Sequence, residues 1–336
     1  MENKLPFEEI ERKILLKKEF STNESYGKIP ENRAINELIN NGVLCLNKPQ
    51  GPSSHQAADY VKRILNSEKV GHGGTIDPNV SGVLPISLGK ATKIMEALLK
   101  AGKEYVCLMH LHSEVSQSKI HKSAKDLIGK ITQLPPVKSA VKRELREREI
   151  YYIEILEIKD KDVLFKVGCQ AGTYIRKLVV DWGKIFGVNA HMQELVRTKA
   201  GPFNDNEWYS LQDIKDAYML LNEGNEANIK KIIKPVEFAM QHLPKVWVAD
   251  SAVDSLCHGT NLSMPGISKL ENCIKKDDLV AVFTLKNELV CLARSLMSSD
   301  DIMRENKGSA LLVARVFMEP ETYPHYRKLY SQNKKA

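Results

Sequence analysis

The 336-residue sequence lacks the hallmarks of disulfide-bonded, zinc-binding and membrane-spanning proteins. It has no C-x-x-C pair, and its six cysteines are scattered, mostly within apolar segments. Such spacing predicts reduced core thiols in a cytoplasmic protein. No apolar run reaches the roughly 18 residues that a membrane helix needs, so no membrane association is expected. The charged N-terminus MENKLPFEEIERK also lacks the apolar core of a secretory signal.

The sequence also lacks the loops that bind common cofactors. Gly82 and Gly89 are separated by six residues and Ala91 follows Lys90, so the Walker spacing fails. The stretch 71-GHGGT-75 lacks the dinucleotide spacing G-x-G-x-x-G. His110 and His112 would share one face of a strand, but no third metal ligand can be named. We therefore expect no cofactor and no metal.

What the sequence does have is a surplus of positive charge and enough apolar residues for a sizeable core. The net charge is +7, the pI is about 8.9 and hydrophobic residues make up 43%. This balance favours a polyanionic partner such as a nucleic acid, although many proteins without one have similar charge. The length leaves room for two domains, and Leu243-Pro244 precedes a region of short, closely spaced strand signals that predict a small β-rich module.

Two segments carry cations whose roles the local pattern leaves open. The stretch 135–148, PPVKSAVKRELRER, is either a solvated helix face or a mobile basic loop that grips phosphates. The stretch 172-GTYIRKLVVDWGKIFGVNAH-191 predicts a helix with Thr173 as its N-cap. Arg176 in the first turn opposes the helix dipole unless it meets an anion.

Asp77 stands alone among acids in the glycine-rich stretch 71-GHGGTIDPNVSGVLPISLGKATK-93. Glycines allow close backbone approach, and Pro78 stiffens the turn after the carboxylate. A carboxylate in this setting suits nucleophilic or general-base chemistry. An Asx-turn or a helix cap is the structural alternative for Asp-Pro.

These motifs together resemble the TruB family of pseudouridine synthases. The stretch around Asp77 is similar to the family's catalytic motif, and four further segments match family motifs in the same chain order: GVLCLNKPQGPSSHQ (42–56), KEY (103–105), GTYIRKLVVDWG (172–183) and ELVRTKAGPF (194–203). The C-terminal region resembles a PUA domain. KVWVADSAVDSLCHGTNLSMPGI (245–267), the basic stretch and the pair Gly73-Gly74 resemble the archaeal, dyskerin-like branch, the catalytic subunit of the H/ACA ribonucleoprotein.

The resemblance implies an α+β fold. It predicts a catalytic domain at 36–243 with a mixed, largely antiparallel sheet flanked by helices, and a thumb loop at about 135–150. A small β-barrel-like PUA domain is expected at 244–322, followed by a basic tail at 323–336. The N-terminal extension 1–35 is expected to pack on the PUA domain.

The resemblance also implies roles for individual residues. Catalysis is assigned to Asp77, Tyr105 and Arg176, with the arginine pairing the aspartate and the tyrosine stacking on a flipped base and aiding proton removal from C5. The substrate pocket is assigned to His72, Tyr174 and Leu195. The RNA-binding thumb is assigned to Lys138, Lys142, Arg143, Arg146 and Arg148. Lys48 and Pro49 are expected to support the catalytic loop.

The activity implied is isomerisation of uridine to pseudouridine without a cofactor. The expected targets are rRNA, guided by a box H/ACA RNA with three small accessory proteins, and uridine 55 of the tRNA T-loop. Two alternatives remain: a stand-alone tRNA enzyme, and a catalytically silent RNA-binding scaffold.

Overall fold

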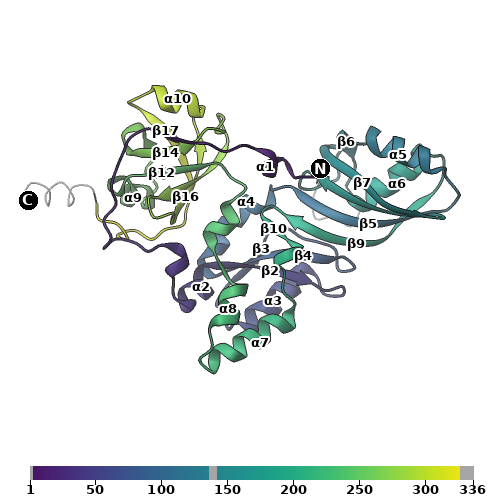
Figure 1. Ribbon diagram of the computed structural model, residues 1–336, viewed down its shortest axis with the longest axis horizontal. Coiled ribbons are helices and arrows are strands. Elements are labelled where there is room, and N and C mark those ends of the chain that lie inside the picture. The colour runs from purple at the N-terminus through teal and green to yellow at the C-terminus, as the bar shows by residue number, and fades with distance from the viewer. Residues whose placement is uncertain (1–2, 136–141, 326–336) are drawn as a thin grey trace, which may run out of the picture.

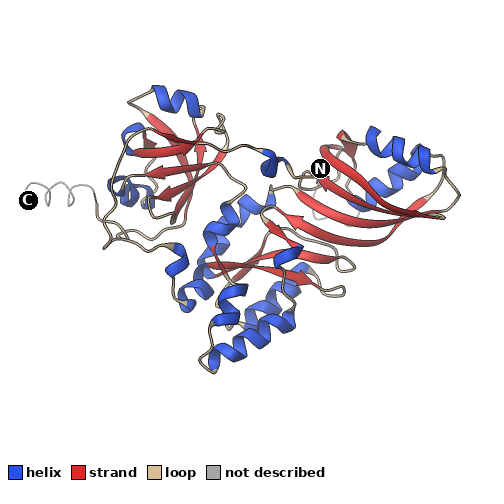
Figure 2. Ribbon diagram, in the orientation of Figure 1, coloured by secondary structure: helices blue, strands red, loops and turns tan. Residues whose placement is uncertain are grey.

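A computed structural model describes residues 3–135 and 142–325 and contains two sheets joined by helices (Figures 1 and 2). The predicted α+β architecture is confirmed, since all strand pairs but two are antiparallel in these residues. The two sheets lie toward opposite ends of the long axis, with α3, α7 and α8 grouped below β2 and β4 (Figure 1).

The larger sheet has ten strands within the described residues, in the order β11-β2-β4-β9-β5-β8-β7-β6, with β3 added to β4 and β10 added to β9. Its strands have these bounds: β2 Gly42–Lys48, β3 Val70–His72, β4 Ser81–Leu88, β5 Lys103–Leu111, β6 Gly129–Gln133, β7 Arg146–Lys159, β8 Asp162–Cys169, β9 Ala190–Ala200, β10 Phe203–Asn204 and β11 Lys234–Pro235.

Helices cover this sheet in two groups. One face of β5 and β8 packs on α5 (Gln117–Asp126) and α6 (Ile175–Ile185), where Trp182 is fully buried and meets Phe165 edge-on. The strands β2 and β4 pack on α2 (Ile35–Asn41), α3 (Ser54–Ile64), α7 (Leu211–Asn222) and α8 (Ala227–Ile232). Ser53 is the N-cap of α3, because its hydroxyl accepts a hydrogen bond from the backbone N–H of Gln56.

The second sheet has seven strands within the described residues, in the order β1-β14-β12-β15-β16-β17-β13. These strands are β1 Ile14–Leu16, β12 Lys245–Val248, β13 Leu262–Ser263, β14 Ile267–Glu271, β15 Leu279–Thr284, β16 Leu289–Ser295 and β17 Ser309–Val316, accompanied by α9 Asp250–Cys257 and α10 Ser299–Arg304. Trp247 and Phe283 of this sheet share a core with Val83 and Met240, so the two sheets are packed together.

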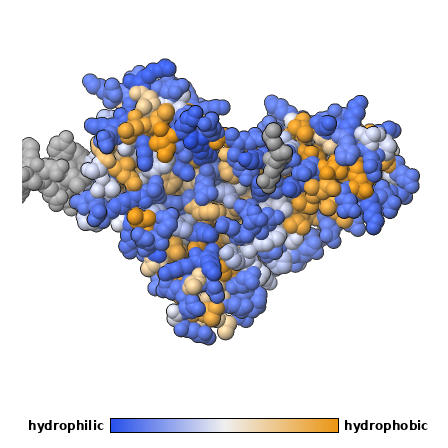
Figure 3. Space-filling view, viewed as in Figure 1, coloured by the Kyte–Doolittle hydropathy of each residue, from blue (hydrophilic) through white to orange (hydrophobic). Residues whose placement is uncertain are grey.

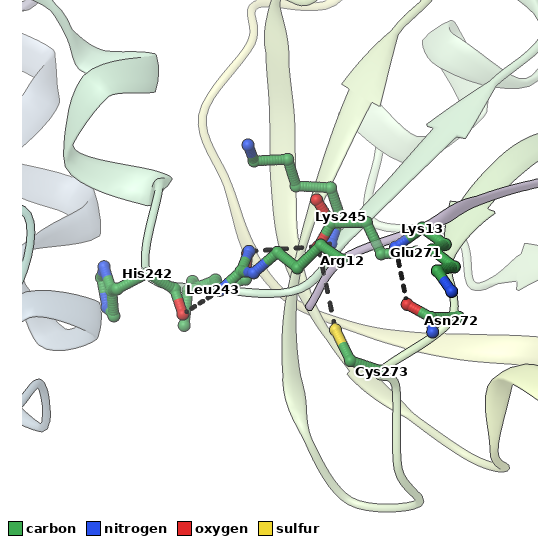
Figure 4. A network of polar contacts seen from close by, with 8 residues as sticks. All are labelled: Arg12, Lys13, His242, Leu243, Lys245, Glu271, Asn272 and Cys273. Carbon is green, nitrogen blue, oxygen red and sulfur yellow. Dashed lines mark hydrogen bonds and ion pairs between the residues drawn. The ribbon is translucent and has the colours of Figure 1, made fainter. Parts of the chain in front are cut away.

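The N-terminal segment, which contains α1 (Pro6–Glu9), crosses from one sheet to the other. It adds β1 to the edge of the second sheet, with Leu15 opposite Leu270. Arg12 donates hydrogen bonds to the carbonyl oxygens of His242 and Leu243, at 2.9 and 2.5 Å, and forms an ion pair with Glu271 at 3.1 Å (Figure 4). One guanidinium therefore ties the N-terminal segment, the inter-sheet linker and β14 together.

The two halves of the larger sheet meet where β4 runs parallel to β9. Only Ser81 and Gly82 make this pairing, opposite Val196 and Arg197. Gly82 has φ +111°, and a Cβ on it would lie 2.2 Å from the carbonyl oxygen of Arg197. Glycine is thus required both by the backbone conformation and by the close approach of the second strand.

The structure corrects four local expectations. Tyr174, not Thr173, is the N-cap of α6, because the Thr173 hydroxyl donates to the carbonyl of Gln170 instead. The apolar spacing of Ala91, Ile94, Met95, Leu98 and Leu99 predicts a helix after Gly89, but this segment begins as a 3₁₀ helix (Gly89–Ile94) before α4 (Met95–Leu99). The apolar spacing along 175–185 predicts that Ile185 lies on the buried face of α6, but its side chain is exposed. Strand β7 starts at Arg146, so the basic stretch ends on a strand and not in a loop.

Replacing Gly82 by alanine should destabilise the protein much more than the same change at Gly187. Both glycines have positive φ, but a Cβ on Gly187 meets nothing within 4 Å. We expect Gly187→Ala to lower the free energy of unfolding by about 1 kcal/mol. Gly82→Ala should cost at least about 2 kcal/mol more because the β4–β9 pair must separate. Chemical denaturation measures both, and equal losses would contradict the close-approach argument.

Arg12→Met should destabilise the protein because it leaves Glu271 buried without its cation. The side chains of Arg12 and Glu271 are only 16% and 6% exposed, so we expect a loss of about 3 kcal/mol. Lys13→Met removes the neighbouring, exposed cation and should change stability by less than about 0.5 kcal/mol. Similar melting curves for the two variants would show that the Arg12 network does not hold the linker.

Candidate active site

Polar contacts to the backbone on both sides of Asp77 fix the conformation of its loop. The hydroxyl of Ser54, at the start of α3, donates to the carbonyl of Ile76 at 3.0 Å and accepts from its N–H at 2.9 Å. The N–H of Val80 donates to the carbonyl of Asp77 at 3.0 Å, which closes a turn around Pro78. The backbone on both sides of Asp77 is therefore fixed before any substrate arrives.

Lys48 anchors the same loop from β2. Its side chain is fully buried, and its ammonium donates to the carbonyls of Pro49, Pro52 and Pro78 at 2.7, 2.9 and 3.3 Å. Burial lowers the pKa of Lys48, and the nearby Asp77 opposes this shift. The segment of Pro49 and the turn after Asp77 are thus joined by one cation, a position that suits the supporting role expected for Lys48 and Pro49.

Asp77 and Arg176 form an ion pair between the loop and the first turn of α6. The side chains of Asp77 and Arg176 are 55% and 56% exposed, so the carboxylate lies at the surface. An exposed ion pair contributes little to stability. The pair places a carboxylate and a guanidinium within reach of a large ligand.

Tyr105 lies on β5 directly opposite Arg197 of β9, next to a bulge between Glu104 and Tyr105. The Arg197 guanidinium therefore lies on the same face of the sheet as the Tyr105 side chain. Burial raises the pKa of Tyr105, whereas the guanidinium acts in the opposite direction. The charge of Asp77 also reaches the Tyr105 hydroxyl, so the tyrosine and the carboxylate belong to one electrostatic site.

Tyr174 is held by Gln133, at the end of β6. The side-chain amide of Gln133 accepts from the N–H of Tyr174 at 2.9 Å and donates to its carbonyl at 3.2 Å. Arg146 lies opposite Gln133 in the β6–β7 ladder. Gln133 therefore connects Arg146, at the end of the basic stretch, to Tyr174 at the start of α6, the helix that carries Arg176.

The remaining pocket residues differ in setting. His72 is half-buried on β3, its Nδ1 has no partner in the described residues, and burial lowers its pKa, so the ring is neutral at pH 7. Leu195 is 6% exposed and packs with Ile76 and Val80 beneath the loop.

The thumb cations are only partly described. Lys138 lies outside the described residues. Lys142 and Arg143 are exposed, whereas Arg146 and Arg148 are half-buried on β7. The Arg148 guanidinium lies against Gly172, where an added Cβ would be 3.1 Å from its Nε. The basic stretch therefore splits into an exposed pair and a pair that packs beside the start of α6.

Sequence reasoning missed Arg197, Ser54, Gln133 and Lys103. Lys103 is 5% exposed, donates to the carbonyls of Leu98, Leu99 and Ala101, and burial lowers its pKa to about 7. Lys103 and Arg197 could have been found from the sequence, because each is a charged residue at an inward-facing position of an otherwise apolar strand pattern. Nothing in the local pattern singles out Ser54 or Gln133.

No cluster of three or more histidine, cysteine, aspartate or glutamate side chains in the described part of the chain could hold a metal ion. His110 and His112 contact a third histidine, His191, which comes from β9, and His110 also meets Asp162 at 2.6 Å.

In the described residues, no helix is long and apolar enough to cross a membrane.

Four family models match the chain. Residues 62–175 match the N-terminal domain of TruB family pseudouridylate synthases, and 176–241 match the C-terminal domain of tRNA pseudouridylate synthase B. Residues 244–317 match a PUA domain, and 2–58 match the DKCLD (NUC011) domain.

Curated relatives match over nearly the whole chain. A "probable tRNA pseudouridine synthase B" of Pyrococcus furiosus is 51% identical over 94% of this chain and 94% of its own. Its counterpart in Methanosarcina barkeri is 51% identical over 96% of this chain and 95% of its own.

Two solved structures are similar over almost their full length. One is described as a Cbf5–Nop10–Gar1 complex, with 51% identity, a TM-score of 0.92 and coverage of 95% of this chain and 98% of the matched chain. The other is an H/ACA ribonucleoprotein bound to a substrate RNA containing 2′-deoxyuridine, with 48% identity, a TM-score of 0.90 and coverage of 96% and 100%. With relatives this similar over almost the entire chain, the protein is a pseudouridine synthase and belongs to the TruB family.

Proposed function

We propose that this chain converts uridine to pseudouridine in rRNA under the direction of a box H/ACA guide RNA, with Asp77 as the catalytic carboxylate. The observation that carries the proposal is the Asp77–Arg176 ion pair. It joins a rigid loop to the first turn of a helix 99 residues further along the chain. The similarity to chains in H/ACA ribonucleoprotein structures supports the guided reaction.

The isomerisation breaks the bond between uracil N1 and ribose C1′, rotates the base and joins C5 to C1′. One proton leaves C5 and one arrives at N1, so no redox partner is needed. Asp77 acts on the sugar, and Arg176 orients one carboxylate oxygen while the other stays free. Tyr105 stacks on the flipped base and aids removal of the C5 proton, while His72, Tyr174 and Leu195 shape the pocket.

The charge distribution supports an RNA partner. The chain has a net charge of +7, and the exposed Lys142 and Arg143 extend from the β6–β7 ribbon beside the start of α6. Cations at this place would hold the phosphates around a flipped nucleotide. The region that matches a PUA domain would hold the end of the guide RNA, or the CCA end of a tRNA.

An apolar stripe on the larger sheet supports small protein partners. The face of β5, β8 and β9 opposite α5 and α6 carries the half-buried side chains Val106, Leu108, Leu164 and Val196. Figure 3 shows apolar side chains gathered over this end of the molecule. The similar Cbf5 chain is described in complex with Nop10 and Gar1, and we propose that this chain also binds small accessory proteins.

A second activity, on uridine 55 of the tRNA T-loop without a guide, is proposed for the same site. The names of the curated relatives support it, since each is described as a probable tRNA pseudouridine synthase B. Both activities fit a cytoplasmic protein, which the six free cysteines also support.

Asp77→Asn should reduce turnover by roughly 10⁴-fold or more while RNA affinity stays within a few-fold, because the carboxylate acts in the chemical step. Tritium release from RNA carrying 5-tritiated uridine measures turnover, and filter binding measures affinity. Asp181→Asn is the matched control, since this aspartate lies on α6 and pairs with Lys177. Unchanged turnover in Asp77→Asn would exclude the proposed mechanism.

The same assay separates the activities. Release only when guide RNA and accessory proteins are present indicates a guide-dependent subunit. Release by the bare chain on an unmodified tRNA transcript establishes the independent tRNA activity. Failure in both settings would favour a silent RNA-binding scaffold.

Neutralising the exposed thumb cations should weaken the salt dependence of RNA binding. With Lys142→Gln and Arg143→Gln combined, the slope of log K against log salt should fall by up to about 1.5, because each lost phosphate contact removes about 0.7 for single strands. Lys215→Gln with Lys231→Gln removes two exposed cations from α7 and α8 and should leave the slope unchanged. If the slope were the same in both variants, Lys142 and Arg143 would be solvated surface residues that do not contact RNA phosphates.

A further inference from the structure

Arg197 is a fully charged group in the interior of the larger sheet. Its side chain is among the largest fully buried ones in the described residues, with 1% of the residue exposed. Burial lowers the pKa of its guanidinium, and Arg197 forms no ion pair with a carboxylate among the described residues. A buried guanidinium without a carboxylate is costly, so its retention calls for a reason other than stability.

The guanidinium joins three elements of the active site. Its Nε donates to the carbonyl of Val83 on β4 at 2.7 Å, and its Nη2 donates to the carbonyl of Gly74 at 3.1 Å. Tyr105 on β5 is its cross-strand partner, and the charge of Arg197 acts to lower the pKa of the Tyr105 hydroxyl. Gly74 is three residues before Asp77, so one planar group spans the loop of the carboxylate and the strand of the tyrosine.

Other contacts do not duplicate this link. Ser54 and Lys48 hold the loop at Ile76 and Pro78, and both come from the β2–α3 side of the site. Neither contacts Tyr105. The relation between the tyrosine hydroxyl and the loop therefore depends on Arg197, whose backbone position is itself set by the close approach of Gly82.

We propose that Arg197 is a positioning residue for the isomerisation, which holds the Tyr105 hydroxyl at a fixed place relative to the Asp77 loop. This inference rests on the proposed function, in which Asp77 acts on the sugar and Tyr105 aids removal of the C5 proton. The planar fork of arginine donates to the carbonyls of Val83 and Gly74 in fixed directions and has further N–H groups facing Tyr105, which the single ammonium of lysine cannot reproduce.

The consequence for the chemistry is a directed proton transfer. After C5 joins C1′, the C5–H bond breaks and N1 gains a proton. The Tyr105 hydroxyl can relay this proton by accepting the one from C5 while passing its own to water, which in turn supplies the proton that N1 gains. As the cross-strand partner of Tyr105, Arg197 is placed to donate to the phenol oxygen and to leave one lone pair of that oxygen for the substrate. The cation also counteracts the rise that burial causes in the pKa of Tyr105, so losing it makes the phenol a poorer relay.

The first test is a double-mutant cycle with Arg197→Met and Tyr105→Phe, measured as tritium release from 5-tritiated RNA under saturating and limiting substrate. Arg197→Met should lower kcat by about 100-fold, since small misplacement of a catalytic group has this effect, and change KM little. If Arg197 acts through Tyr105, the double variant should be no more than about threefold slower than the slower single variant. Independent, multiplicative losses would overturn the proposal.

Lys199→Met is the matched control for charge removal on the same strand. Lys199 forms a partly buried ion pair with Glu8 of α1 and does not contact the Asp77 loop, so its loss should leave kcat within about twofold. A loss equal to that of Arg197→Met would show that any cation on β9 serves, which would also overturn the proposal.

Arg197→Lys keeps a cation and provides a second readout if the methionine variant does not fold. With 5-deuterated uridine, proton removal from C5 should become more rate-limiting in Arg197→Lys, so its deuterium isotope effect on kcat should exceed that of the wild type. An isotope effect equal to the wild-type value would contradict a role through Tyr105. These results are separable from the proposed function, which fails only if wild type is inactive or Asp77→Asn is active.

Discussion

The parallel contact between β4 and β9 is the constraint on which the rest of the site depends. It spans only Ser81 and Gly82 on β4, yet it joins the half of the sheet that carries the Asp77 loop to the half that carries Tyr105 and packs on α6. The contact requires a residue without a Cβ, because Arg197 backbone atoms lie where a side chain would begin. Ordinary sheet pairing thus becomes the means by which three distant segments meet.

Buried cations stabilise the geometry of this junction at a cost in desolvation. Lys48, Lys103 and Arg197 are each buried, and in the described residues their hydrogen bonds go mainly to backbone carbonyls. An apolar core would be more stable, but it offers no directional contacts to irregular loops. The charged groups hold turns whose carbonyls would otherwise lack donors, so the loop around Asp77 keeps one conformation although Asp77 itself faces solvent.

The two sheets are packed into one body by side chains from both and by the N-terminal segment. Trp247 and Phe283 share a core with Val83 and Met240, and Arg12 bridges the linker and Glu271. This packing sets the region that matches a PUA domain at a definite place relative to the Asp77–Arg176 pair. An RNA held at both places would span them, which suits a large structured RNA better than a free nucleotide.

The sequence alone determined the local elements and the residue types available for chemistry. Strand β5 was readable because apolar residues occupy both alternating faces of its sequence, although the structure fully buries mainly one of them, and α3 because Ser53 precedes an amphipathic pattern. Asp77, Tyr105 and Arg176 were selected by motif resemblance, since a lone Asp-Pro or a first-turn arginine has ordinary structural explanations. Their roles stay predictions.

Only the tertiary structure decided which groups meet. The link from Arg197 to Gly74 and Tyr105 depends on a bulge in β5 and on a two-residue parallel contact, and neither has a local sequence signal. The hold of Gln133 on Tyr174 and the start of β7 at Arg146 likewise depend on cross-strand pairing. Long-range contacts of this kind arise from the packing of whole elements, so the pattern along the chain determined the elements and the fold determined the site.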